Sequence, residues 1–260
     1  MKRIVNPARD RLVAGEVSIG IGLRQARTVD IAKAMKTCGY DWLFIDLEHN
    51  SMSIDTAVQI SVAALDAGIT PLVRVPWMEH WIATRVLDGG ALGIVMPHVD
   101  TADQARETVD RLKYPPLGHR SVAGAMPAFD FGRVNAAEAI AAINATTLVV
   151  VMIETPQAVE NADAIAAVEG VDVLLIGTND LSTEMGLPGQ FGHERIVAAY
   201  ETVIAACRKH GKWAGMGGAY AEEHLRRYIG RGVRMVLAGS DLTLMMQAGA
   251  QMTSLVRSCL

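Results

Sequence analysis

The stretch Thr147-Leu148-Val149-Val150-Val151-Met152-Ile153 is an apolar run rich in β-branched residues, and Glu154-Thr155-Pro156 follows it directly. A short apolar run of this kind is typical of a strand that is buried on both faces, as the strands of parallel sheets are. The proline suits the first turn of a helix, where an N–H group would have no partner within the helix. The stretch therefore predicts one buried strand and then one helix, with a carboxylate at the junction.

The same succession of an apolar run and a helical pattern recurs along the chain. Strands are expected at Val17–Leu23, Trp42–Asp46, Thr70–Val75, Gly93–Pro97, Thr147–Ile153, Val171–Ile176, Lys212–Met216 and Arg234–Ala238. Helices are expected at Thr28–Thr37, Ser53–Ala67, His80–Asp88, Thr101–Leu112, Pro156–Val168, His193–His210, Ala221–Gly230 and Leu242–Ser258. This pattern predicts a single α/β domain over residues 1–260, a closed (β/α)8 (TIM) barrel.

A doubly wound open sheet is the alternative to the barrel. Such a sheet usually carries a glycine-rich phosphate-binding turn after its first strand. Here Gly20 and Gly22 are followed by Leu23-Arg24-Gln25-Ala26, and the third glycine of that turn is missing from its register. The sequence therefore favours the barrel.

Composition narrows the class of protein and the kinds of partner. Half of the residues are apolar but only 5% are aromatic, so aliphatic side chains must fill the core. The net charge of −4 is spread without a basic stripe, so no nucleic acid partner is expected. No apolar run reaches the length of about 18 residues that a membrane-crossing helix needs. The cysteines, Cys38, Cys207 and Cys259, lack disulfide or metal-site spacing, which favours a cytoplasmic protein.

Two carboxylates, Glu154 and Asp180, follow consecutive predicted strands. Because the carboxyl ends of all barrel strands meet at one face, where barrel chemistry gathers, these side chains are expected to lie close together. Oxygen ligands in small number suit Mg²⁺ or Mn²⁺, with water and substrate as the remaining ligands. The alternative is structural, with Glu154 capping the following helix and Asp180 serving as an N-cap.

Arg74 and His49 also stand where predicted strands end. A guanidinium at the end of the apolar strand Pro71–Pro76 needs an anion, either a substrate carboxylate or enolate or a neighbouring carboxylate. His49 lies three residues after Asp46, which predicts an acid–base pair in which the aspartate orients the imidazole. A local turn contact is the alternative for His49. His98 follows the fourth strand but has no such neighbour in sequence.

Six stretches in order resemble the HpcH/HpaI family of metal-dependent 2-oxo-acid aldolases, which includes 4-hydroxy-2-oxoheptanedioate and 2-dehydro-3-deoxyglucarate aldolases. They are Asp41–His49, Pro71–Pro76, Gly93–Pro97, Tyr114–Arg120, Ile153–Thr155 and Gly170–Ser182. The resemblance covers nearly the whole chain. It implies a class II aldolase that forms or cleaves 4-hydroxy-2-oxo acids, joining pyruvate or hydroxypyruvate to an aldehyde. The implied cofactor is Mg²⁺ or Mn²⁺, with Co²⁺ as a further candidate.

The resemblance also implies roles for particular residues. Glu154 and Asp180 would hold the metal, and Arg74 would stabilise the enolate. His49, paired with Asp46, would move the proton on the aldol oxygen. The remaining implied residues are Gly177, Thr178 and Asn179, which would bind the substrate carboxylate, and Asp88, which would help to form the site at a subunit boundary. Met152 stands where the family often has glutamine, so the substrate preference is expected to differ.

The resemblance implies a homo-oligomer, a hexamer or trimer, in which neighbouring subunits exchange the last barrel helix. The segment Asp241–Ser258 carries more apolar residues than one face against its own barrel needs. These residues are Leu242, Leu244, Met245, Met246, Met252, Leu255 and Val256.

Three rival functions remain at this point. A citramalyl- or malyl-thioester lyase would share the metal–enolate chemistry, but no basic patch for coenzyme A phosphates is evident. A decarboxylating enzyme similar to macrophomate synthase is the second rival, and a barrel-based binding protein is the third. No lysine stands at a predicted carboxyl strand end, and Lys212 begins its strand, which argues against a Schiff-base aldolase.

Overall fold

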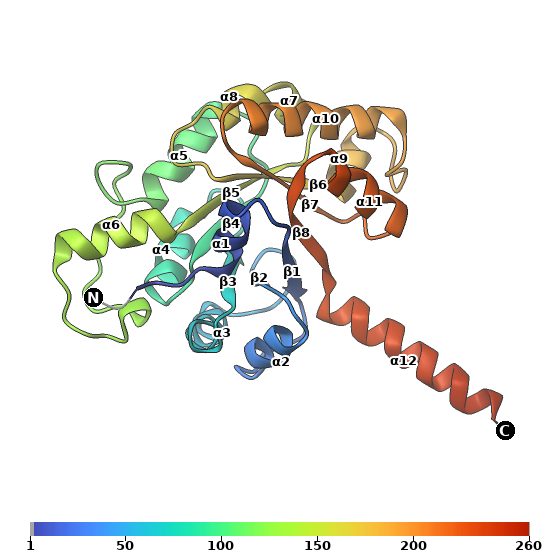
Figure 1. The fold of residues 1–260 in the computed structure, drawn as a ribbon, viewed down its shortest axis with the longest axis horizontal. Coiled ribbons are helices and arrows are strands. Elements are labelled where there is room, and N and C mark those ends of the chain that lie inside the picture. Colours follow the sequence, from blue (N-terminus) through green and yellow to red (C-terminus); the bar gives the residue numbers. More distant parts are fainter. Residues whose placement is uncertain (1–2, 260) are drawn as a thin grey trace.

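The computed structural model describes residues 3–259 and shows a closed barrel of eight parallel strands in sequence order, with β1 paired to β8 (Figure 1). The barrel predicted from the sequence is therefore confirmed. The strands are β1 Ser18–Leu23, β2 Trp42–Asp46, β3 Thr70–Arg74, β4 Gly93–Met96, β5 Leu148–Ile153, β6 Val173–Gly177, β7 Trp213–Gly217 and β8 Val233–Ser240.

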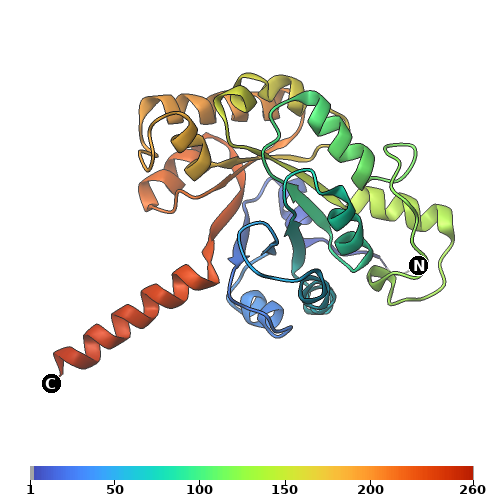
Figure 2. The ribbon, with the colours of Figure 1, turned by 180° about the vertical axis from the view of Figure 1, so that it is seen from behind.

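Helices follow the strands and cover the outside of the barrel, as Figure 2 shows from behind. They are α2 Ile31–Thr37, α3 Ile54–Ala67, α4 His80–Asp88, α5 Ala102–Leu112, α7 Pro156–Glu160, α8 Ala162–Ala166, α10 Glu194–Lys209 and α11 Glu222–Arg231. The last strand is followed by α12 Asp241–Ser258, which does not cover the barrel. Elements that the sequence analysis did not anticipate are α1 Pro7–Val13, α6 Ala136–Thr146, α9 Thr178–Glu184 and a 3₁₀ turn over Pro127–Phe129.

One expected helix is wrong in detail. The segment Pro156–Val168 forms two short helices, α7 and α8, instead of one. Asn161 ends the first and begins the second, and its side-chain amide donates a hydrogen bond of 2.8 Å to the carbonyl of Asp100. This tertiary contact interrupts a helix that the local pattern alone would continue.

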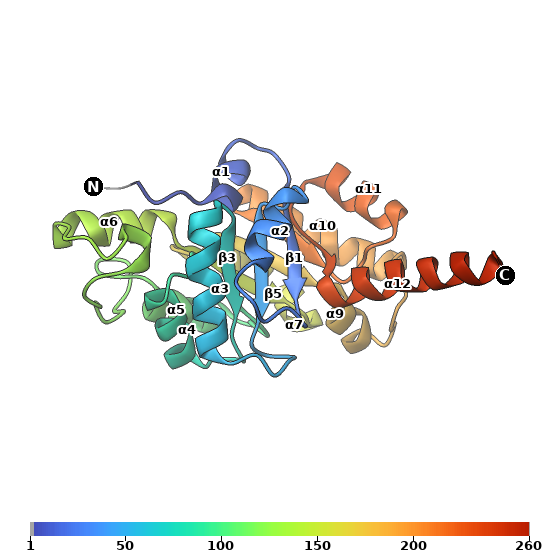
Figure 3. The ribbon, with the colours of Figure 1, turned by 90° about the horizontal axis from the view of Figure 1, so that it is seen from below.

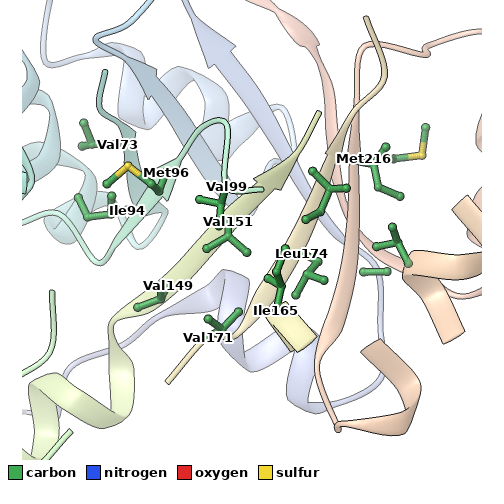
Figure 4. Close-up of a cluster of buried hydrophobic side chains, with 14 of the residues drawn as sticks. Val73, Ile94, Met96, Val99, Val149, Val151, Ile165, Val171, Leu174 and Met216 are labelled. Atoms are coloured by element: carbon green, nitrogen blue, oxygen red, sulfur yellow. The ribbon is translucent and has the colours of Figure 1, made fainter. Parts of the chain in front are cut away.

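Side chains of successive strand residues point alternately into the barrel and toward the helices, as the period of two in a strand requires. Phe44 and Leu72 belong to the cluster inside the barrel. Their neighbours, Ile45 and Val73, belong to the larger cluster between strands and helices. Figure 4 shows part of that outer layer, where Val73 lies next to Met96 and Ile94, and Val151, Leu174 and Met216 follow further along the barrel wall. Every residue of β2 to β6 is buried, which explains the continuous apolar runs in the sequence.

The amino end of the barrel is closed by α1. Its residues Ala8 and Leu12 pack into the cluster inside the barrel. Asn6, the N-cap, accepts hydrogen bonds from the Arg9 N–H at 3.1 Å and from the Thr70 hydroxyl at 2.9 Å. The Thr70 hydroxyl in turn accepts from the Ala8 N–H at 3.0 Å, which ties the helix to β3. The amino end of the barrel interior is therefore filled by side chains.

The last helix, α12, projects away from the barrel (Figures 1 and 3). None of its residues is buried, and Met246 is 63% exposed. Only its first turn is anchored, because the Asp241 carboxylate accepts hydrogen bonds from three backbone N–H groups of residues 24–26 at 2.7 to 2.9 Å. Across residues 3–259, no helix has both the length and the apolar character needed to cross a membrane.

Candidate active site

A cavity of about 400 Å³ opens at the carboxyl end of the barrel. Figure 3 shows the strands running toward this end, which lies opposite α1. The walls come from the ends of the strands and the turns that follow them. The lining residues are Gly22, Arg24, Phe44, Asp46, His49, Arg74, Met152, Leu175, Gly177, Thr178, Asn179, Asp180, Gly217, Gly218, Tyr220, Leu237, Gly239, Ser240, Leu242 and Thr243.

Asp46 and Arg74 form a buried ion pair in the wall of this cavity. They are direct partners in the register of β2 and β3. Arg74 donates two hydrogen bonds, from Nε to Asp46 Oδ1 at 2.9 Å and from a terminal nitrogen to Oδ2 at 2.6 Å. Its other terminal nitrogen lies 3.0 Å from a Glu48 oxygen, and its guanidinium lies 5.0 Å from the Phe44 ring. The neighbouring-carboxylate alternative considered for Arg74 is thus part of the structure.

This pair sets the protonation of both partners. Burial pushes the pKa of Asp46 upward, but the hydrogen bonds and charge of Arg74, with backbone N–H groups, bring it below its usual value. Burial also disfavours the charged form of Arg74, and the carboxylates around it outweigh that effect and raise its pKa. Both groups are therefore charged, and the guanidinium is held in place by its carboxylate partners in the cavity wall.

The expected pairing of the Asp46 carboxylate with the His49 imidazole is wrong. Asp46 Oδ1 accepts the backbone N–H of His49 at 3.3 Å, and the rest of the carboxylate is occupied by Arg74. The imidazole Nε2 lies instead 3.8 Å from Glu48 Oε2. His49 lines the cavity with about half of its side chain exposed. It is placed by the backbone turn that Asp46 holds, while its ring stays accessible to a substrate.

Glu154 is almost completely buried at the end of β5. Its Oε2 accepts the backbone N–H of His98 at 2.8 Å and lies 3.3 Å from Nδ1 of the same residue. His98 has φ of 50°, a left-handed conformation that aims its N–H at the carboxylate. A histidine from the turn after β4 thus contacts one of the two carboxylates. Burial, with the nearby charge of Asp180, raises the pKa of Glu154 to about 7 against the opposing effects of His98 and Arg74.

Gly177 leaves room for this carboxylate. The register pairs Ile153 with Ile176, so Glu154 lies beside Gly177. A Cβ atom at Gly177 would lie 2.6 Å from Glu154 Oε1, a separation that real Cβ atoms do not show. The glycine is therefore required by the position of Glu154.

The residues of the turn after β6 differ in their exposure to the cavity. The Thr178 hydroxyl is buried and lies 2.6 Å from both the Tyr200 hydroxyl and the Gly217 carbonyl, so it holds the turn in place. Asn179 and Asp180 are exposed at the cavity. The capping alternatives for the two carboxylates are wrong, because Thr155 caps α7 and Gly177 is the N-cap of α9.

Glu154 and Asp180 fit a hard divalent cation. Within residues 3–259 no three His, Cys, Asp or Glu side chains gather as a metal site, so the protein offers few ligands. A buried carboxylate with a raised pKa opposite a second carboxylate is a donor pair that a cation would stabilise in its charged form. All-oxygen donors with an open coordination sphere suit Mg²⁺ or Mn²⁺.

Asp88 does not belong to this cavity within one chain. It ends α4, which runs back toward the amino ends of the strands. Its carboxylate lies 2.5 Å from a terminal nitrogen of Arg120, which also stacks on the Tyr114 ring at 4.7 Å. The expected catalytic contribution of Asp88 therefore depends on a neighbouring subunit.

Four residues that the structure brings to the site had no role predicted from the sequence. Glu48 joins Arg74 to His49 and His98 through its two oxygens. His98 fixes Glu154, while Arg24 and Tyr220 line the cavity. Glu48, His98 and Arg24 directly follow predicted strands or lie within two residues of their ends, so position was the available signal.

A family model described as HpcH/HpaI aldolase/citrate lyase matches residues 24–248. The chain belongs to this family. It is 42% identical over 245 residues to the 4-hydroxy-4-methyl-2-oxoglutarate aldolase tasA of Hapsidospora irregularis, covering 92% of this chain and 90% of that protein. It is 35% identical over 256 residues to a 2-keto-3-deoxy-L-rhamnonate aldolase of Escherichia coli, covering 98% and 94%. Family and relatives together make the chain a carbon–carbon lyase of the aldolase type.

Solved structures agree with the fold. The crystal structure of an HpcH/HpaI aldolase from Desulfitobacterium hafniense superimposes with a TM-score of 0.91 at 32% identity, covering 96% of both chains. Macrophomate synthase, at 24% identity and a TM-score of 0.79, shares the fold alone. The same holds for the Mycobacterium tuberculosis citrate lyase β subunit complexed with oxaloacetate and magnesium, at 15% identity and 0.57. Macrophomate synthase and this citrate lyase subunit are thus more distant from the chain than the aldolases named above.

Proposed function

We propose that this chain is a divalent-metal-dependent aldolase that forms and cleaves 4-hydroxy-2-oxo acids, with pyruvate or hydroxypyruvate as the donor. The observation that carries the proposal is the buried Glu154, whose pKa is raised to about 7 by burial and by the charge of Asp180. Asp180 lines the cavity together with Arg74 and His49. A binding protein would gain nothing from a buried carboxylate held opposite a like charge. In an enzyme that uses a divalent cation, the same two carboxylates would increase the affinity for that cation.

Glu154 and Asp180 would hold Mg²⁺ or Mn²⁺, with Co²⁺ as a further candidate, and the bound ion would polarise the 2-oxo group as a Lewis acid. Gly177, Thr178 and Asn179 would bind the substrate carboxylate through the turn that begins α9. With the carboxylate assigned to these residues, Arg74 would bind the oxygen at C2 of the substrate.

Cleavage proceeds through groups that this chain supplies. His49 removes the proton of the C4 hydroxyl, and the C3–C4 bond breaks as a carbonyl forms at C4. The electron pair passes toward the C2 oxygen, and the charge of Arg74 stabilises the enolate that results. Protonation at C3 then yields pyruvate. Aldol addition is the same sequence in reverse.

The acceptor is not decided by the relatives' names. One relative is named for a methylated hydroxy-oxoglutarate, a diacid, and the other for a deoxy sugar acid. Both names describe 2-oxo acids, so the donor half of the substrate is the shared part. Met152, whose thioether lines the cavity, replaces an amide-bearing residue expected in the family and offers no hydrogen-bond donor.

The test is deuterium exchange at pyruvate C3, followed by NMR with and without added Mg²⁺ or Mn²⁺. The exchange needs enolate formation but no acceptor. We expect exchange that depends on metal and disappears on chelation or in Asp180→Asn. Asp163→Asn is the matched control, because Asp163 is an exposed carboxylate on α8 paired with Lys209. Full exchange in the presence of a chelator would overturn the proposal.

We further propose a homo-oligomer, a hexamer or trimer, in which α12 packs on a neighbouring subunit. Its apolar side chains, such as Met245 and Leu255, are each 59% exposed in one chain, which a free helix would not sustain in water. The same assembly would bring Asp88 to a neighbour's site. Removing the chain from Leu242 onward should dissociate the assembly in sedimentation velocity and lower activity. A native protein that sediments as a monomer with full activity would contradict this. The cytoplasmic location stays a prediction.

A further inference from the structure

Arg24 stands in the cavity wall on a rigid support. It follows β1 directly, and its backbone N–H donates a hydrogen bond of 2.8 Å to Asp241 Oδ1. The side chain of Arg27 donates to the Arg24 carbonyl, also at 2.8 Å. The backbone of this arginine is therefore held from both sides, while its side chain is 43% exposed at the cavity.

The guanidinium of Arg24 has donors to spare. Its nearest carboxylate is that of Asp46, at 3.8 Å, beyond hydrogen-bond distance. Asp46 is already saturated, because Arg74 occupies both oxygens and the backbone N–H groups of Glu48 and His49 share Oδ1. In the part of the chain that the structure describes, no side-chain hydrogen bond from Arg24 to an acceptor is recorded. Arg24 thus differs from Arg74, which donates to both oxygens of Asp46 and lies 3.0 Å from a Glu48 oxygen.

The surroundings of Arg24 give room for a ligand group. Gly22, Gly218 and Gly239 line the same cavity and contribute no side chain to it. Tyr220 lines it as well, and burial raises the pKa of its phenol while Arg24 and Arg74 act against that rise. Arg24, Arg74 and Tyr220 thus share one cavity wall with glycines that add no side chain to it.

From this arrangement we propose that Arg24 binds a carboxylate on the acceptor half of the substrate, so that the preferred substrates are 4-hydroxy-2-oxo diacids and the released acceptor is itself an oxo acid. The proposal rests on the proposed aldolase function. An anchored guanidinium with free donors at a polar cavity is the group that recognises a planar carboxylate in two-point fashion. The metal pair and the α9 turn are assigned to the donor half, so a second carboxylate would need a separate cation, and Arg24 is placed to supply it.

The test compares two substrates that differ in one group. 4-Hydroxy-2-oxoglutarate carries a carboxylate at C4, and 4-hydroxy-2-oxopentanoate carries a methyl group there. We expect the wild-type protein, with Mg²⁺, to prefer the diacid. Arg24→Gln should lower kcat/KM for the diacid by about 10- to 100-fold, as for loss of a charge-assisted hydrogen-bond pair. The same variant should change cleavage of the pentanoate by less than about threefold and leave pyruvate deuterium exchange unchanged.

Two further variants complete the experiment. Arg24→Lys keeps the charge without the planar fork and should recover part of the diacid preference. Arg106→Gln removes an arginine that pairs with Asp103 on the exposed face of α5 and should change neither substrate. Thermal unfolding of each variant checks that the barrel is intact.

The outcomes separate the two proposals. Equal losses for both substrates in Arg24→Gln would show that Arg24 only supports Asp46, and lost pyruvate exchange would place it on the donor side. Either result overturns the role proposed for Arg24 while the aldolase function stands. A wild-type protein that fails to exchange pyruvate with any of the metals would overturn the aldolase function, and this proposal with it.

Discussion

The two ends of the barrel use the same residue types for opposite purposes. At the amino end, Asp172 accepts the Val149 N–H at 2.8 Å and lies 3.9 Å from the ammonium of Lys113. At the carboxyl end, Glu154 accepts the His98 N–H at the same distance, but the nearby Asp180 carries a like charge.

The two ends differ in whether a buried carboxylate has a cationic partner that balances its charge. Asp41, also at the amino end, accepts the Ile19 N–H at 2.9 Å and a side-chain N–H of Arg11 at 3.2 Å, so it ties strand starts together under α1. At the carboxyl end, the pKa of Glu154 is raised toward neutrality and the cavity is open to solvent. Carboxylates with cationic partners stabilise the fold, whereas a carboxylate facing another carboxylate creates affinity for a cation.

The largest effect that follows from this contrast concerns Glu154→Gln. The amide keeps an oxygen for the His98 N–H but removes the charge, so metal-dependent turnover should fall at least about a thousandfold, roughly 4 kcal/mol. The melting temperature should not fall, because a buried charge is removed. Steady-state cleavage and calorimetry measure the two quantities. A variant that melts well below the wild type would place Glu154 among the structural carboxylates.

Arg74→Lys should cause the next largest loss of activity. Lysine keeps the positive charge but loses the planar fork that bridges Asp46 and Glu48, so enolate stabilisation should drop by about 2–4 kcal/mol, the range for one oxyanion donor. Pyruvate deuterium exchange at saturating substrate measures this loss. Wild-type exchange in this variant would contradict the role assigned to Arg74.

Asp172→Asn tests the other end. Lys113 is buried and donates to the Asn144 and Thr147 carbonyls, so removing its carboxylate should lower the free energy of unfolding by about 1–3 kcal/mol. Pyruvate exchange should stay at the wild-type rate when folded protein is compared. Urea unfolding gives the stability. If exchange fell and stability did not, Asp172 would serve catalysis, and the assignment of stabilising carboxylates to the amino end would be wrong.

The smallest effects concern pH, and Asp46 and Asp172 should respond with opposite sign. The pKa of Asp46 is lowered, so its contribution is present above about pH 4 and is lost as pH falls through the folded value. Burial raises the pKa of Asp172, against the opposing charge of Lys113. Its contribution is therefore present below about pH 4 and is lost as pH rises through the folded value. The measurement is the free energy of unfolding against pH for the wild type and both variants. We expect Asp46→Asn to lose only the pH dependence assigned to Asp46, and Asp172→Asn to lose only that assigned to Asp172.

Much of the site was predictable because parallel strands all end at one face. Once the apolar runs define strands, Glu154, Asp180, Arg74 and His49 must approach one another, whatever the details of packing. Partners across strands were not predictable in the same way. Asp46 was expected to hold the His49 ring, but the register of β2 and β3 sets it opposite Arg74, whose two donors bind it instead.

The sequence by itself determined the barrel, its order and the end that carries the chemistry, because hydrophobic period and strand polarity are local properties. The tertiary structure alone decided how charges are shared. It placed His98 against Glu154 through a left-handed backbone, left the guanidinium of Arg24 unsaturated, and directed α12 outward from its own barrel. Each of these depends on strand register, loop conformation or the direction in which a helix leaves its last anchored residue. A pattern read along the sequence does not encode such three-dimensional relations.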